Sequence, residues 1–230
     1  MIKAVFIDYT GTTVQEDGEE IREVVKRVCR NSELHDPRGV MKLWWKRMKE
    51  YEESSYGNSY LTEDEIVDHI LESMVKEIHL KENLGELHEL IRSFRINAPA
   101  FPDAEIFFKK CPVPIYVISN NGVQYVKKGM KQKKLIPKEV ICADMVRAYK
   151  PHREIFEKAL EVSGCRPDEV LHIGDSYRSD IQGARLAGIR PILIQRAENE
   201  KYTDVMVVKE LPEVLNFLDA QSHPKLDKTE

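Results

Sequence analysis

The chain has 230 residues, of which 42% are hydrophobic and 32% charged, and its formal net charge is −4 with a pI near 6.0. This composition excludes a disordered or fibrous protein, and the length accommodates one or two domains that bury their own cores. The slightly acidic balance argues against nucleic acid as a partner, and no apolar run is long enough to predict a membrane span.

The four cysteines are widely spaced and form no CxxC pair. This spacing predicts neither a zinc site nor a disulfide framework, so we expect reduced thiols that are mostly buried. The sequence Met-Ile-Lys leads directly into an apolar run, which leaves no room for a signal peptide. We therefore expect a cytoplasmic protein.

The first predicted element is a strand over Ile2–Ile7, which is apolar, rich in β-branched and aromatic residues, and followed by Asp8. The next stretch, from about residue 18 to residue 94, contains no convincing strand and has the periodicity of helices. Its four helical segments are Ile21–Cys29, Val40–Tyr51, Glu63–Ile78 and Leu84–Phe94. Thr62 followed by Glu65 is a capping-box pattern that opens the third helix. Asn97–Pro102 contains two prolines and returns the chain from this stretch.

From about residue 100, strand and helix patterns alternate. The predicted strands are Ile115–Ile118, Glu139–Cys142, Val170–Ile173, Pro191–Ile194 and Val205–Val208, and the predicted helices are Val123–Met130, Glu154–Val162 and Ile181–Ala187. Such alternation predicts βαβ units, and hence an α/β fold with a Rossmann-like parallel sheet covered by helices.

These patterns predict a discontinuous core domain over residues 1–15 and 98–220, an α-helical cap domain over residues 16–97, and a flexible tail over residues 221–230. Ligands bind at the carboxyl ends of strands in open parallel sheets. An insertion that leaves from the end of the first strand is therefore expected to roof the binding site.

Polar groups follow the predicted strands in four places. The first strand leads into Asp8–Thr13, where Gly11 permits a tight turn whose N–H groups suit phosphate oxygens. The second leads into Ser119–Gly122, which offers a hydroxyl and N–H groups at a helix start. Lys150 stands just before a proline that begins a helix. Gly174–Asp180 carries two carboxylates five residues apart across a turn.

A nucleophile, a hydroxyl, a lysine and paired carboxylates in this order resemble the motifs of the haloacid dehalogenase-like hydrolase superfamily. The resemblance covers residues 2–13 and about 100–195. The helical stretch stands where that superfamily inserts its first type of cap domain. The resemblance implies a Mg²⁺-dependent hydrolase in which Asp8 attacks a small phosphorylated molecule and forms an aspartyl phosphate, which water then hydrolyses.

The resemblance also assigns roles to the polar residues. Mg²⁺ would be held by one Asp8 oxygen, the Thr10 backbone carbonyl and Asp175, since magnesium prefers oxygen ligands. Asp180 would orient waters or Lys150, and Lys150 would balance the negative charge of Asp8 and of the phosphate. The expected phosphate-binding residues are Thr12, Ser119, Asn120 and Lys150, and the expected catalytic residues are Asp8, Thr10, Ser119 and Lys150.

One position departs from the common pattern. Phosphatases of this superfamily usually carry a second Asp two positions after the nucleophile, where it protonates the leaving group and then activates water. Thr10 stands there. Threonine is no general acid near neutral pH, and loss of such assistance costs roughly 10²–10⁴ in rate.

A phosphatase acting on a small metabolite is the first hypothesis, and three alternatives stay open. The run Asp8–Thr13 is similar to the motif of phosphonatases, which form a Schiff base with a cap lysine, here Lys42, Lys46 or Lys49. A 2-haloacid dehalogenase would attack carbon without a metal, against which the paired carboxylates argue. A ligand-binding protein with low turnover would explain Thr10. The sequence does not distinguish a monomer from a homodimer.

Overall fold

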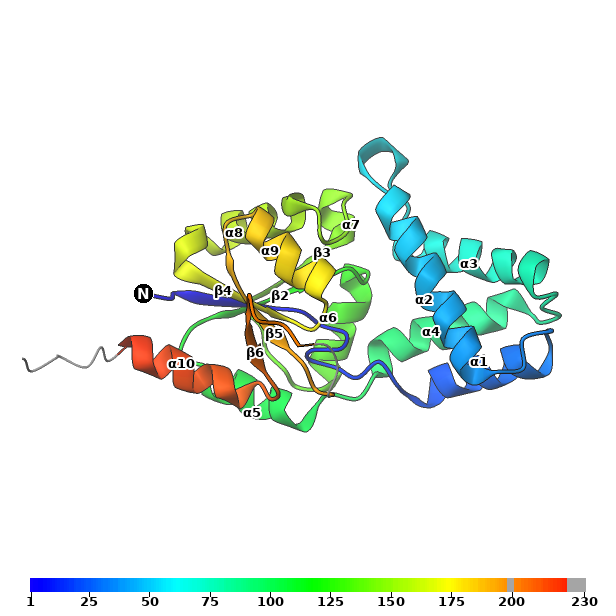
Figure 1. Ribbon diagram of the computed structural model, residues 1–230, viewed down its shortest axis with the longest axis horizontal. Helices are drawn as coiled ribbons and strands as arrows, with labels where there is room; N and C mark the ends of the chain where they lie inside the picture. The colour runs from blue at the N-terminus through cyan, green and yellow to red at the C-terminus, as the bar shows by residue number, and fades with distance from the viewer. Residues whose placement is uncertain (198–200, 223–230) are drawn as a thin grey trace, which may run out of the picture.

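The computed structural model describes residues 1–197 and 201–222, which contain one six-stranded sheet (Figure 1). All neighbouring strands are parallel, in the order β3-β2-β1-β4-β5-β6. The strands are β1 (Ala4–Ile7), β2 (Ile115–Ser119), β3 (Glu139–Cys142), β4 (Val170–Gly174), β5 (Arg190–Ile194) and β6 (Met206–Val208). These bounds confirm the predicted strands and the Rossmann-like α/β fold class.

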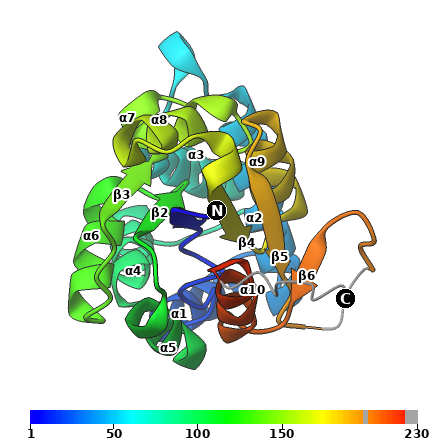
Figure 2. The same cartoon turned by 90° about the vertical axis from the view of Figure 1, so that its left-hand side faces the viewer.

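Helices cover both faces of the sheet (Figure 2). They are α5 (Pro102–Lys110), α6 (Val123–Gln132), α7 (Ala143–Val146), α8 (Arg153–Ser163), α9 (Gly183–Leu186) and α10 (Pro212–Ser222). Alternate residues of β1 point to opposite faces. Phe6 packs in the same cluster as Phe156 of α8, whereas Val5 packs with Phe107 of α5 and Val126 of α6. Both faces are apolar because both are covered.

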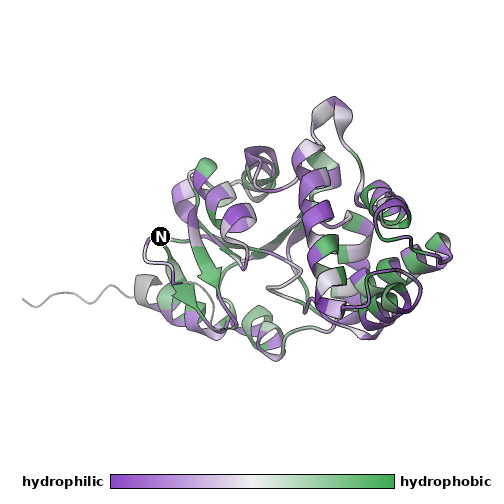
Figure 3. Cartoon of the chain, turned by 45° about the vertical axis from the view of Figure 1, so that its right-hand side comes forward, coloured by the Kyte–Doolittle hydropathy of each residue, from purple (hydrophilic) through white to green (hydrophobic). Residues whose placement is uncertain are grey.

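The predicted helical insertion forms four helices beside the sheet, at its side opposite the N-terminus (Figure 1). They are α1 (Glu19–Arg30), α2 (Pro37–Ser54), α3 (Glu63–Glu77) and α4 (Leu84–Asn97), with a 3-10 turn at Gly57–Ser59. The capping box is present, because Thr62 accepts a hydrogen bond from the Glu65 N–H and Glu65 accepts one from the Thr62 N–H. In Figure 3 the helices of the insertion alternate between hydrophobic and hydrophilic residues, as amphipathic helices do.

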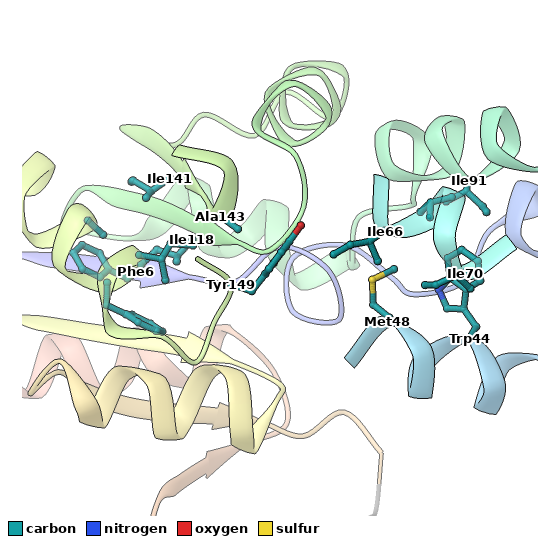
Figure 4. Close-up of a cluster of buried hydrophobic side chains, with 14 of the residues drawn as sticks. Phe6, Trp44, Met48, Ile66, Ile70, Ile91, Ile118, Ile141, Ala143 and Tyr149 are labelled. Carbon is teal, nitrogen blue, oxygen red and sulfur yellow. The ribbon is translucent and has the colours of Figure 1, made fainter. Parts of the chain in front are cut away.

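The core of the insertion is continuous with one face of the sheet (Figure 4). Trp44, Met48 and Ile70 pack inside the insertion, and Tyr149 lies between them and the sheet residue Phe6. Of the adjacent tryptophans, Trp44 is buried and Trp45 is 43% exposed, as expected for neighbours that point about 100° apart on a helix.

Some elements differ from the prediction. The short helices α5, α7 and α10 were not predicted, and the helix expected over Ile181–Ala187 begins earlier, as a π-helical turn at Tyr177–Gln182. Residues 221 and 222, which were expected to belong to the tail, lie in α10, and the rest of the expected tail, residues 223–230, lies outside the described residues. All four cysteines are free, but only Cys142 is fully buried.

The topology places the ends of three strands side by side. β1 lies at the centre, with β2 on one side and β4 on the other, so the order of the strands reverses at this point. Ligands of open α/β sheets bind at such a switch point, at the carboxyl ends of the strands. Of the helices in the described ranges, none combines the length and the apolar character that crossing a membrane requires.

Candidate active site

Asp8 stands at the end of β1 and is fixed through its backbone. Its N–H donates to the Ile173 carbonyl of β4 at 2.9 Å, and its carbonyl accepts from the Thr13 hydroxyl at 2.6 Å. Gly11 has φ +87°, and a Cβ there would lie 2.5 Å from an oxygen of Asp175. Glycine at position 11 therefore permits the turn after β1 to pass close to the turn after β4.

Lys150 joins the carboxylates of two different strand ends. Its Nζ donates to Asp8 Oδ1 at 2.5 Å and to Asp180 Oδ1 at 2.6 Å, and the residue is only 4% exposed. The backbone N–H of Lys150 donates to Asn120 Oδ1 at 2.7 Å, which ties the lysine to the loop after β2. The structure thus brings together the predicted nucleophile, lysine and second carboxylate.

The Gly174–Asp180 turn directs two carboxylates toward Asp8. Ser176 caps the π-helical turn, and Asp180 lies within this turn, where it accepts from the Ser176 N–H at 3.1 Å. Asp180 is therefore not the cap of a helix that starts at position 181. A Cβ at Gly174 would lie 2.1 Å from the Asp180 carboxyl carbon, so glycine makes room for that carboxylate. His172 of β4 also contacts Asp180 Oδ1, at 3.0 Å.

In the loop after β2, Asn121 binds two hydroxyl groups near the site. Asn121 Oδ1 accepts from the Thr10 hydroxyl at 2.8 Å and from the Ser119 hydroxyl at 3.0 Å. Asn121 Nδ2 donates to Glu63 of the insertion at 2.6 Å. Asn121 was not among the predicted site residues, although it lies in the predicted phosphate-binding run Ser119–Gly122.

The side chain of Thr12 does not lie where a phosphate-binding residue was expected. Its side chain is fully buried and donates to Asp175 Oδ1 at 3.0 Å. Asp8, Thr10, Ser119, Asn120, Lys150, Asp175 and Asp180 all line the cavity at this edge, but Thr12 does not. Thr12 therefore orients Asp175.

Oxygens of Asp8, Asp175 and Asp180 lie within 4.8 Å of one another. Burial raises the pKa of Asp8 to about 7, repulsion from Asp180 adds to the effect, and Lys150 opposes it. Burial and repulsion from Asp8 and Asp180 raise the pKa of Asp175 well above its usual value. Three carboxylates beside one ammonium leave an excess of negative charge, so this oxygen-rich cluster fits a divalent cation such as Mg²⁺.

A cavity of about 810 Å³ lies over the cluster and extends into the insertion. Its floor is formed by polar strand-end residues, and its far wall is formed by apolar residues of α1, α2 and α4. The apolar lining includes Val24, Val28, Trp44, Met48 and Phe94. Lys49 also lines the cavity, whereas Lys42 and Lys46 do not. The arrangement can hold an anionic group at the strand ends and an organic group beneath the insertion.

Residues 2–188 match the family model of the haloacid dehalogenase-like hydrolases. The chain belongs to this family. Curated relatives include the glyceraldehyde 3-phosphate phosphatase of Pyrococcus furiosus, 32% identical over 36% of this chain and 37% of the relative. The pyrophosphatase PpaX of Bacillus mycoides is 32% identical over 48% of this chain and 54% of the relative. The chain thus spans about a third to a half of the length of these relatives.

The fold is also similar to that of solved haloacid dehalogenase-like structures. The L-2-haloacid dehalogenase of Xanthobacter autotrophicus superposes with a TM-score of 0.78 over 95% of this chain and 99% of that chain. The two sequences are 19% identical, so this likeness concerns the fold alone. Relatives of this family thus include both phosphatases and dehalogenases by name.

Proposed function

We propose that the protein is a Mg²⁺-dependent phosphatase that hydrolyses a small phosphorylated metabolite through an aspartyl phosphate on Asp8. The observation that carries this proposal is the buried cluster in which Lys150 bonds both Asp8 and Asp180, with Asp175 within 4.8 Å of these carboxylates. A carboxylate nucleophile and a phosphate are both anionic, so their reaction requires nearby positive charge. One lysine does not offset three carboxylates, and a divalent cation would.

Asp8, the Thr10 backbone carbonyl and Asp175 are the residues proposed to hold Mg²⁺. Bound there, the ion would supply the charge neutralisation that lets an anionic phosphate approach Asp8. Within the chain, Asp8 attacks phosphorus, and Lys150 orients Asp8 and attracts the phosphate. Asp180 holds Lys150 in place through its 2.6 Å hydrogen bond. The Ser119 hydroxyl would bind a further phosphate oxygen in place of its hydrogen bond to Asn121.

Phosphonate hydrolysis is a second candidate, and one contact favours it. Lys49 of α2 lines the cavity that contains Asp8, so it is the lysine of the insertion that an aldehyde-bearing phosphonate would meet. Schiff-base formation with Lys49 predicts that borohydride traps a covalent adduct with such a substrate. Absence of the adduct, or its presence in a Lys49→Met variant, counts against phosphonate hydrolysis.

Release of phosphate from a panel of phosphorylated metabolites, with a phosphonate and a 2-haloacid included, tests the proposal. We expect hydrolysis of one or more phosphate esters in Mg²⁺, loss of that activity in EDTA, and no activity for Asp8→Asn. Halide release from the 2-haloacid without metal, or equal phosphate release by the wild type and Asp8→Asn, contradicts the proposal.

A further inference from the structure

Thr10 occupies the position from which a general acid would reach the leaving group, and it does not supply a proton. Its hydroxyl donates to Asn121 Oδ1 at 2.8 Å. A hydroxyl is also far too weak an acid to protonate a departing alkoxide near neutral pH. If the proposed hydrolysis includes proton transfer, another group that faces the same cavity must carry it.

Glu52 is an acidic residue of the insertion that faces this cavity. It lies in the last turn and a half of α2 (Pro37–Ser54) and lines the cavity together with Asp8 and Lys150. The Asn120 side chain, which lines the same cavity, favours the charged form of the Glu52 carboxyl and so lowers its pKa. Asn120 in turn accepts a hydrogen bond from the Lys150 N–H at 2.7 Å. Glu52 is therefore one side chain away from the lysine that contacts the nucleophile.

Two other carboxylates of the insertion that face the cavity are paired with cations, whereas Glu16, which also lines the cavity, forms no ion pair within the described residues. Glu53 forms an ion pair with Arg178, and Glu63 forms one with Arg95 at 2.7 Å. Within residues 1–197 and 201–222, no ion pair is formed by Glu52. A carboxyl group without a cationic partner is free to exchange a proton with a ligand in the cavity.

The loop that follows α2 fixes Glu52 over the site. Gly57 N–H donates to the Arg147 carbonyl at 2.9 Å, and Arg147 Nε donates to the Gly57 carbonyl at 2.8 Å. The Tyr149 hydroxyl donates to the Leu61 carbonyl at 2.8 Å. These contacts join the insertion to the segment that immediately precedes Lys150. They place the end of α2 close to the segment that carries the lysine.

The surroundings of Glu52 favour its neutral form at neutral pH. Burial raises the pKa of Glu52 to about 8, with a contribution from the charge of Glu63, while the Asn120 side chain and the charge of Lys150 oppose the rise. The negative charge of Asp8 also raises the pKa of Glu52. The negative end of the α2 dipole also disfavours a carboxylate near the C-terminus of the helix.

We propose that Glu52 is the general acid and base of this site, supplied by the insertion in place of the residue at position 10. This proposal rests on the proposed phosphatase function. When Asp8 attacks phosphorus, the bond to the leaving oxygen breaks, its electron pair stays on that oxygen, and the proton of Glu52 neutralises it. Water then attacks the aspartyl phosphate and gives its proton to the Glu52 carboxylate. The bond between phosphorus and the Asp8 oxygen breaks, which restores both carboxyl groups and releases inorganic phosphate.

Glu52→Gln removes the proton but keeps the size of the side chain. We expect its kcat on an alkyl phosphate of the panel to fall by roughly 10²–10⁴. A nitrophenyl phosphate needs no proton for departure of its leaving group. Stopped-flow measurement should therefore show a burst of one nitrophenolate per enzyme at nearly the wild-type rate, followed by slow turnover, because hydrolysis of the aspartyl phosphate lacks its base.

The controls separate this role from a structural one. Glu50→Gln alters an exposed carboxylate of α2 that pairs with Arg47, and it should retain wild-type kinetics on both substrates. Glu16→Gln alters another carboxylate of the cavity. This variant should turn over both substrates as the wild type does, without a burst followed by slow turnover. Circular dichroism and thermal stabilisation by Mg²⁺ should match between Glu52→Gln and the wild type, as evidence of an intact fold.

Loss of the burst together with the steady-state rate in Glu52→Gln overturns the proposal, as does unchanged turnover of the alkyl phosphate. The same leaving-group dependence in Glu16→Gln, and not in Glu52→Gln, overturns it too. Failure of the phosphatase function would give a different result. The wild type and Asp8→Asn would then release phosphate equally, and variants of Glu52 would not change the rate of phosphate release.

Discussion

At the scale of single residues, the site depends on a lysine that is buried between two carboxylates. Burial alone would lower the pKa of Lys150, but Asp180 and Asp8 outweigh burial and raise it. Burial would likewise raise the pKa of Asp180, yet Lys150 and His172 bring it below its usual value. Each charge is thus stable in the interior only because its partner is present.

Replacing Lys150 with methionine removes the cation that Asp8 and Asp180 share, and leaves Asp8 buried without its cationic partner. Removal of one partner from a buried ion pair lowers the free energy of unfolding by about 3–5 kcal/mol. We expect this loss in urea denaturation of Lys150→Met in EDTA at neutral pH. Lys127→Met removes a lysine that is 53% exposed and pairs with Glu139, so it should cost less than about 1 kcal/mol. Equal losses in the two variants contradict the account of a buried cluster.

The raised pKa of Glu52 makes a prediction about pH and stability. Because the pKa of Glu52 in the folded protein is about 8, above its ordinary value of 4.5, the folded state holds this proton more tightly than the unfolded chain. The stability that this group contributes is fully present below pH 4.5 and is lost as pH rises through about 8. Urea midpoints of the wild type and Glu52→Gln should agree near about pH 4, and the variant should have the higher midpoint near about pH 9. A constant difference across this range contradicts the raised pKa.

The sequence was sufficient to predict the residues that stand at strand ends, because each follows an apolar run directly. Asp8, Ser119 and Asp175 are such residues, whereas Lys150 lies beyond β3 and α7 and was predicted from its place before Pro151. The cavity brings all four together. Residues that act through contacts between segments were missed. Asn121 joins Thr10 and Ser119 to the insertion, and its role depends on neighbours more than 50 positions away. His172 interrupts an apolar strand, and that interruption was its one detectable signal.

At the scale of elements, the loop between α2 and α3 joins the insertion to the sheet, in addition to the two chain connections and the contacts of α3 with the loop after β2. Tyr56 forms a bridge with Ala148, its ring stacks on His152 at 4.7 Å between centroids, and its hydroxyl contacts Glu154. Tyr60 stacks on Tyr149 at 5.2 Å. These contacts hold the end of α2 against the segment that carries Lys150.

Replacing Tyr56 with alanine removes a ring stack and a hydrogen bond of this loop. We expect the Gly57 amide, which donates to the Arg147 carbonyl, to exchange with deuterium about tenfold faster, because local opening becomes easier. Turnover of alkyl phosphates should fall in parallel as Glu52 loses its fixed position. Ile136→Ala, at a residue 85% exposed, should change neither quantity. Unchanged exchange at Gly57 in Tyr56→Ala would show that the loop is held by other contacts.

Elements with strong hydrophobic periodicity were predicted correctly, whereas elements whose conformation depends on tertiary contacts were missed. The six strands and four helices of the insertion follow their hydrophobic patterns. α5 begins at Pro102 and has few core positions, chiefly Ala104 and Phe107, so its pattern is too short to recognise. The π-helical turn at Tyr177–Gln182 is fixed by the Ser176 cap and by the contact of Asp180 with Lys150, neither of which periodicity reveals.

At the scale of the whole molecule, the sheet and the insertion contribute different properties to one cavity. The strand ends provide buried charge, and the insertion provides apolar walls and the carboxyl group of Glu52. Apolar walls exclude water and strengthen the electrostatic interactions at the strand ends. The account predicts that the phosphoryl group binds at the strand ends and that the organic group determines specificity beneath the insertion.

Covalent phosphorylation of Asp8 during turnover tests this account most directly. The wild type and Glu52→Gln are mixed with substrate in Mg²⁺, quenched in acid, digested, and analysed by mass spectrometry. We predict one phosphoryl group on the peptide that contains Asp8, more abundant in Glu52→Gln because its hydrolysis is slowed, and absent from Asp8→Asn. Continuing turnover with no adduct on Asp8, or with the adduct on another residue, contradicts the account.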